Sequence, residues 1–180
     1  MKKLHSIVAA AVATLALAGT AHADTIWNFS FSDIASGSTM TASGQFVTTG
    51  NGSTPSDILS ITGTYSDGTT VNGALSLVPV SVGGGVQNTS PDGFYYFDNV
   101  YGGAGGLDNA GLLFLAGGQE VNLYTDNGTF TVATTYAGFG GWTYTPVTFS
   151  ATAVPEPGSV ALLLAGLGAL GVAGRRRARA

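Results

Sequence analysis

The sequence predicts an all-β domain, an antiparallel β-sandwich or jelly-roll-like fold, followed by a short C-terminal transmembrane helix. Ser, Thr and Gly dominate the composition between residues 24 and 153. Short runs with apolar residues at every second position recur there between turn residues, and this is the period of a half-buried strand. No window in this region has a convincing 3.6-residue apolar period. About eight or nine strands with frequent turns are therefore expected.

The first strands are predicted in residues 26–31 and 43–48. Trp27, Phe29 and Phe31 share one face of the first of these strands, as a half-buried strand requires. The start of the second strand is blurred by Gly44.

Two further segments, residues 58–65 and 71–80, are predicted to pair with each other. Ser66-Asp67-Gly68 stands between them, and Asp and Gly favour turns.

An aromatic segment at residues 94–101 is predicted to form the next strand. Phe94 and Tyr96 would face one side of it, and Tyr95 and Phe97 the other. One pair is expected to be core. The alternative is that part of this cluster forms a stacking platform for sugar rings.

The last strands are predicted from three signals. Residues 111–116 are a continuous apolar run suited to a buried strand. Asn127-Gly128 tolerates positive φ, so the segments that flank it, 119–125 and 129–136, are predicted to form a type I′ hairpin. Residues 142–152 close the domain, and Pro146 within them indicates an edge or a bulge.

All charged residues of the domain are acidic. Nine of the ten acidic residues lie between residues 24 and 153, and all six Lys and Arg residues lie outside this range. An acidic surface repels phosphate backbones, so nucleic-acid binding is disfavoured. The chain contains no cysteine, so no disulfide framework is expected.

The same range lacks the usual catalytic side chains. The two histidines, His5 and His22, precede it, and it contains no His, Cys, Lys or Arg. A Ser-His-Asp or Cys-His centre, a Schiff-base lysine and the usual zinc ligands are therefore excluded. A pair of carboxylates that includes Glu120 is the remaining enzymatic option. We expect Glu120 to be a solvated strand residue and the chain not to be an enzyme.

No cofactor or metal ligand is assigned. Several aspartates stand beside Gly or Asn, and oxygen-rich loops could bind Ca²⁺. None of these loops has the spacing of a calcium loop, and Asp and Asn also favour turns. Turn formation is the preferred interpretation, with Ca²⁺ kept as the alternative.

The N-terminus predicts a secretory signal. Lys2 and Lys3 precede an apolar run over residues 7–18, and Ala21-His22-Ala23 fits a signal peptidase site. Cleavage is expected after Ala23. The apolar run is too short to span about 30 Å of hydrocarbon.

The C-terminus has three parts. The first part is a short segment with two prolines, Pro155-Glu156-Pro157. An apolar run follows over residues 160–174, and an arginine cluster comes last. A helix over the apolar run would rise only about 22 Å, so it predicts a thin membrane span. The arginines are expected to remain cytoplasmic, which places the domain outside.

This tail resembles the PEP-CTERM sorting signal. The resemblance implies that Pro155, Glu156 and Pro157 form the recognition motif for exosortase, a membrane protease that processes exported proteins of Gram-negative bacteria. By the same resemblance, Arg175, Arg176 and Arg177 would form the cytoplasmic stop. The family is associated with exopolysaccharide and biofilm production. The resemblance implies no fold or ligand for the preceding domain.

Together these observations predict a signal peptide (1–23), an exported β-rich domain (24–153) and a sorting tail (154–180). The expected function is that of a non-enzymatic surface or extracellular-matrix protein. It would be anchored transiently in the inner membrane, with signal peptidase, exosortase and exopolysaccharide as partners. A carbohydrate- or calcium-binding module and a self-assembling fibre subunit are the alternatives.

Overall fold

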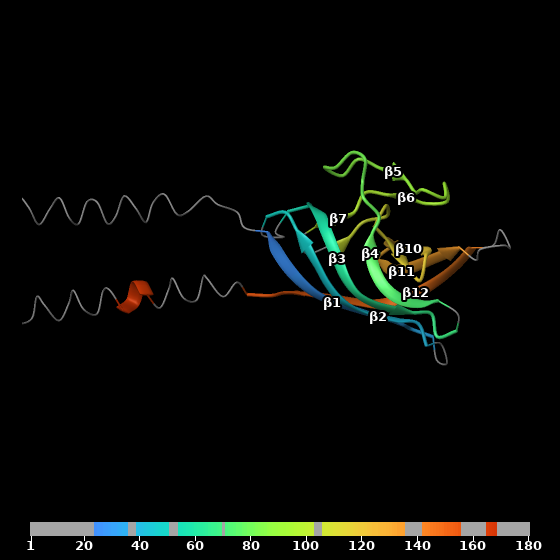
Figure 1. The fold of residues 1–180 in the computed structure, drawn as a ribbon, viewed down its shortest axis with the longest axis horizontal. Helices are drawn as coiled ribbons and strands as arrows, with labels where there is room; N and C mark the ends of the chain where they lie inside the picture. Colours follow the sequence, from blue (N-terminus) through green and yellow to red (C-terminus); the bar gives the residue numbers. More distant parts are fainter. Residues whose placement is uncertain are drawn as a thin grey trace, which may run out of the picture.

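The domain is a closed ring of antiparallel strands (Figure 1). The computed structural model describes residues 24–35, 39–50, 54–69, 71–102, 106–135, 142–155 and 165–168. The strands are β1 Thr25–Asp33, β2 Thr41–Thr48, β3 Ser56–Ser66, β4 Asn72–Leu77, β5 Asn88–Thr89, β6 Tyr96–Phe97, β7 Val100–Gly102, β8 Gly106–Leu107, β9 Leu112–Ala116, β10 Gln119–Asp126, β11 Thr129–Thr135 and β12 Trp142–Ala153.

Eight of these strands form the ring, in the order β2-β1-β12-β11-β10-β9-β4-β3, and a further β2–β3 pairing closes it. The short strands β7 and β8 continue from β3, and β5 and β6 form a separate pair. This pair lies apart from the ring, at the top of Figure 1. The prediction of an all-β antiparallel fold is therefore confirmed. The sandwich or jelly-roll arrangement is not confirmed. Strands with alternating apolar and polar residues fit a barrel as well as a sandwich, and the sequence does not reveal which strands pair.

Two strands act as corners by changing neighbours along their length. β12 pairs with β11 through residues 142–146 and with β1 through residues 147–153. β4 pairs with β3 through its first half and with β9 through its second half. Pro146 lies where β12 changes neighbours, so it marks a switch in pairing and not an edge strand. A residue without an amide hydrogen is tolerated at such a point.

The interior of the ring is filled by alternating apolar residues. Phe29 and Phe31 of β1 point inward, as the alternation predicts. The ring of Tyr101 on β7 packs against Trp27, with centroids 4.8 Å apart, and against Phe46 at 5.0 Å. These three aromatic rings fill the interior at the end of the barrel where β1 begins.

A glycine pair lets β2 and β3 approach closely. Gly44 and Gly63 lie opposite each other, and a Cβ on Gly63 would meet the Cα of Gly44 at 2.7 Å as well as the carbonyl oxygen of Ser43. Gly63 also has a φ of 142°, which L side chains rarely adopt. Strand glycines of this kind permit tight bends, here in the wall of the barrel.

Both predicted hairpins are confirmed. β10 and β11 pair up to Asp126 and Thr129, and Asn127 and Gly128 between them have φ values of 47° and 82°. This geometry fits the expected type I′ turn. In the turn between β3 and β4, Asp67 Oδ1 accepts the amide hydrogens of Thr69 at 2.7 Å and Val71 at 3.0 Å.

The predicted aromatic strand is interrupted. β6 ends at Phe97 and β7 begins at Val100, because Asn99 has a φ of 53°. An asparagine can adopt this left-handed conformation, and a strand cannot continue through it.

The two chain ends of the barrel lie side by side. Trp27 near the start of β1 is opposite Ala153 at the end of β12, and Val154 N donates to Ile26 O at 2.8 Å. The predicted signal peptide, with its cleavage site at Ala23, lies outside the described residues.

The predicted transmembrane helix is not supported. Within the described part of the chain, no helix is long and apolar enough to cross a membrane. Of the apolar run over 160–174, the structure describes residues 165–168, which form one helical turn.

Candidate functional site

The outer surface of the barrel has two different walls. One wall, formed by β12, β1, β2, β3 and the start of β4, is bare and is called the polar wall. Three rows of outward side chains run across these strands, and the side chains of these rows carry no charge. The rows are Thr152, Asn28, Gln45 and Thr62; Ser150, Ser30, Ser43, Thr64 and Ala74; and Thr148, Ser32, Thr41, Ser66 and Asn72.

The register of the strands sets the spacing of these side chains. Neighbouring strands lie about 4.8 Å apart, so hydroxyl and amide groups repeat at that interval along each row. Gln45 Nε2 donates to Asn28 Oδ1 at 2.9 Å, and the hydroxyls of Ser30 and Ser150 are 3.1 Å apart. All of the row residues are exposed except Ser66, which is half-buried. The polar wall thus presents a regular array of neutral hydrogen-bonding groups to solvent.

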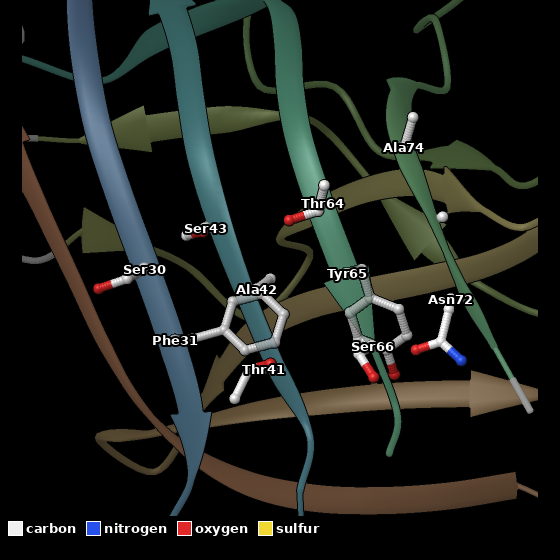
Figure 2. A pocket seen from close by; sticks show the side chains of 11 residues that line it. Ser30, Phe31, Thr41, Ala42, Ser43, Thr64, Tyr65, Ser66, Asn72 and Ala74 are labelled. Atoms are coloured by element: carbon white, nitrogen blue, oxygen red, sulfur yellow. The ribbon is translucent and has the colours of Figure 1, made fainter. Parts of the chain in front are cut away.

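A shallow depression lies on this wall, with a volume of about 700 Å³. Ser30, Ser43 and Thr64 line it from three neighbouring strands, and Asn72 and Ala74 line it from β4 (Figure 2). Phe31, Ala42 and Tyr65 also line it, so the depression combines hydroxyl and amide groups with apolar surface. The depression can therefore accept a neutral, hydrogen-bonding ligand.

The opposite wall, formed by β9, β10 and β11, is called the covered wall, because residues 78–99 pack over its outer side. Val78, Tyr95 and Phe97 of this cap form an apolar cluster with Leu113 of β9 and Ala133 of β11. In the aromatic segment the alternation is confirmed, since Tyr95 and Phe97 are buried while Phe94 is 47% and Tyr96 66% exposed.

One buried asparagine, Asn99, joins the cap to the barrel, and another, Asn88, bonds within the cap. Asn99 is fully buried, donates from Nδ2 to Val78 O at 2.7 Å, and accepts from Leu113 N at 2.8 Å. Asn88 donates from Nδ2 to Val82 O at 3.0 Å and to Val86 O at 2.7 Å. Sequence reasoning missed both, since a buried asparagine leaves no periodic signal.

Glu120 lies beneath this cap, and the prediction that it is solvated is wrong. It is 2% exposed, because its side chain points outward from β10 into the space that residues 78–99 cover. Its Oε1 accepts from Asp92 N at 3.2 Å, and Oε2 has no partner. Burial raises the pKa of the neighbouring Tyr95 hydroxyl; the hydrogen bond to Thr135 opposes this shift and the charge of Glu120 adds to it. Glu120 therefore belongs to the packing of the cap and is not presented to a substrate.

Asp98 is a second buried acidic residue, and the exposed Asp108 lies near it. Asp98 is 3% exposed, and desolvation together with the negative charge of Asp108 raises its pKa to about 6. The amide of Val100, which donates to Asp98 Oδ1 at 3.1 Å, partly opposes this shift. Asp108 Oδ1 accepts from Ala110 N at 2.9 Å and Gly111 N at 3.0 Å.

The turn interpretation is confirmed for three of the aspartates that stand beside Gly or Asn. Asp67, Asp98 and Asp108 each bond to the amides of nearby residues. Among the residues that the structure describes, no three His, Cys, Asp or Glu side chains are grouped so that they could hold a metal ion.

The predicted sorting residues follow the barrel directly. Pro155 is exposed, one residue after the last hydrogen bond between β12 and β1. Glu156, Pro157, Arg175, Arg176 and Arg177 lie outside the described part of the chain.

Fold and chain ends together define a β-barrel protein with a C-terminal sorting segment. Residues 153–177 match the family model described as the PEP-CTERM protein-sorting motif. The chain thus carries a PEP-CTERM sorting motif, and the motif supports export with transient anchoring at the membrane and processing by an exosortase. No curated protein and no solved structure matches the chain significantly.

Proposed function

We propose that the barrel is a non-enzymatic component of the cell surface or the extracellular matrix, delivered there by its C-terminal motif. The observation that carries this proposal is the position of the motif. The match begins at Ala153, the last residue of β12, so the folded barrel is the part of the chain that the tail delivers. A role beside exopolysaccharide in a biofilm is part of the same proposal.

Sorting is tested by the mass of the mature protein recovered outside the cell. We expect a chain without residues 175–180, because an exosortase would act near Pro155, Glu156 and Pro157. Glu156→Ala should keep the chain in the membrane fraction. Asp126→Ala, which removes an exposed acid far from the motif in sequence, should be sorted normally. A secreted protein that still contains Arg175 would contradict the proposal.

The non-enzymatic part of the proposal rests on access to the carboxylates. A glycosidase places two carboxyl groups on either side of the scissile bond. Glu120 and Asp98 are both nearly fully buried, so a glycan could reach neither unless the cap opened. Hydrolysis of a glycan by the purified chain that is lost in Glu120→Gln would overturn this part.

A carbohydrate-binding role is the second candidate, and the rows of the polar wall favour it. Neutral hydroxyl and amide groups at strand spacing can hydrogen-bond a neutral polysaccharide, and each net bond is weak, about 1 kcal/mol. Several such bonds along one chain can add up to useful avidity. The acidic domain would repel an anionic polysaccharide.

Affinity electrophoresis in neutral and anionic polysaccharides tests this candidate. Retardation by a neutral polysaccharide should fall severalfold in Thr64→Val, which keeps the side-chain volume in the depression but removes a hydroxyl. Thr89→Val, an exposed position on β5 in the cap, is the matched control. Equal retardation of both variants, or retardation only by an anionic polysaccharide, would reject the polar wall as the site.

The remaining alternatives are calcium binding and fibre formation. A calcium titration that changes neither stability nor spectrum would remove the first. Fibre growth by strand addition needs an open strand edge, whereas the described strands of the ring close on one another and leave no terminal strand. The absence of cross-β diffraction from concentrated protein would remove the second.

A further inference from the structure

The row of the outer wall nearest the two chain ends differs from the three polar rows. Val154 bonds to Ile26, Ile26 is opposite Val47, and Val47 is opposite Ser60. Thr48 then pairs with Ile58, so Leu59 is the extra residue of a bulge. We call Val154, Ile26, Val47 and Leu59 the apolar row.

This row leaves a substantial apolar surface in water. Ile26 is 42% and Leu59 49% exposed, and Val47 and Val154 are half-buried. A loop lies near the row, since Gly84 N donates to Asp57 Oδ1 at 2.9 Å, two residues before Leu59. That loop carries Val82, which is 54% exposed. Single exposed apolar residues are ordinary, but a row of adjacent ones commonly marks an interaction surface.

The position of the apolar row indicates its partner. β1 begins at Thr25, and β12 ends at Ala153 on the strand beside it. The signal segment precedes the first of these residues and the sorting motif follows the second. While the tail is anchored, only the few residues after Pro155 separate the apolar row from the bilayer, so its effective concentration at the lipid surface is high.

We propose that the apolar row is the surface through which the barrel rests on the lipid while the chain is anchored by its tail. This inference rests on the anchoring that the sorting motif supports. The four residues of the row are all apolar, and the polar groups beside them are the small hydroxyl of Ser60 and the carboxylate of Asp57, which accepts from Gly84 N. The row therefore suits the apolar boundary of a bilayer better than a specific protein surface. The nine acidic residues of the domain make a zwitterionic surface more favourable than an anionic one.

The absence of cysteine from the chain allows a direct test. Leu59→Cys and Ser66→Cys place one label each on β3, the first in the apolar row and the second in the polar row farthest from it. The full chain is reconstituted into phosphatidylcholine vesicles, and its association with them is checked by flotation. Quenching of an attached fluorophore is then measured with a water-soluble quencher and with a lipid-borne one.

We expect the label at residue 59 to be severalfold less accessible to the aqueous quencher than the label at residue 66, and to be quenched from the lipid. Equal aqueous quenching at the two sites in floated protein would overturn the inference while leaving the anchoring intact. Failure of the chain to float would overturn both. Protection that occurs in native membranes but not in phosphatidylcholine vesicles would assign the row to a membrane protein and reject the lipid.

Discussion

The covered wall and the polar wall are built from strands of the same ring, yet they are stabilised differently. In β9 and β10 consecutive residues are buried, because residues 78–99 shield the side that would otherwise face water. In β1 burial alternates with exposure. The outer face of the covered wall takes part in the packing of the domain, whereas the outer face of the polar wall is exposed to solvent. Substitutions with the same chemistry should therefore have unequal effects on the two walls.

The largest difference is expected for removal of an outward side chain. Leu113 points out of the ring but is fully buried beneath the cap. Leu113→Ala should lower the free energy of unfolding by roughly 3–4 kcal/mol, through lost burial and the cavity that remains. Leu59→Ala, at an outward position of β3 that is 49% exposed, should lower it by about 1 kcal/mol or less. Urea denaturation measures both, and equal effects would mean that the cap does not seal the covered wall.

A smaller difference is expected for asparagines. Asn99→Ala leaves Val78 O and Leu113 N without their partners, so a loss of about 2–3 kcal/mol is expected. Asn28→Ala removes one exposed hydrogen bond with Gln45, and a loss below about 0.5 kcal/mol is expected. Hydrogen exchange of the cap amides should rise in the first variant and not in the second. Unchanged exchange in Asn99→Ala would show that another contact holds the cap.

The smallest effect concerns pH. Burial and Asp108 raise the pKa of Asp98 from 3.8 to about 6 in the folded state, so the folded protein binds this proton more tightly than the unfolded one does. The free energy of unfolding should therefore fall as pH rises between about 4 and 6, by on the order of 1–2 kcal/mol. Asp98→Asn should remove this part of the slope, whereas Asp126→Asn in the exposed hairpin should not. Identical slopes in wild type and Asp98→Asn would show that Asp98 does not titrate as described.

The sequence predicts local features of this fold well and the arrangement of its walls poorly. The hairpin at Asn127-Gly128 and the buried run at 111–116 follow from turn chemistry and from burial on both faces, which are local properties. Ring closure depends on the pairing of β12 with β1, two strands at opposite ends of the domain. No local pattern encodes that pairing.

The same distinction explains the site residues. The burial of Glu120 follows from a cap that is distant in sequence, so alternation alone wrongly placed this residue in solvent. The polar wall was visible only as a Ser/Thr-rich composition until the register aligned its side chains into rows. The sorting motif needed no tertiary information, because a short linear segment carries it.

The pairing of β12 first with β11 and then with β1 also affects how the anchored protein resists mechanical load. Drag on a domain held by its tail enters the barrel at Ala153 and runs along β12. The bonds of β12 to β11 and to β1 lie across that direction, so the load shears many of them together and does not open them one at a time. Pulling on the C-terminus against an attachment at Ala35, beyond the far end of β1, should therefore require a high rupture force in a single-molecule experiment, and a force as low as that for unzipping a hairpin would contradict this view. The strand that leads into the tail is thus well suited to hold the barrel against flow.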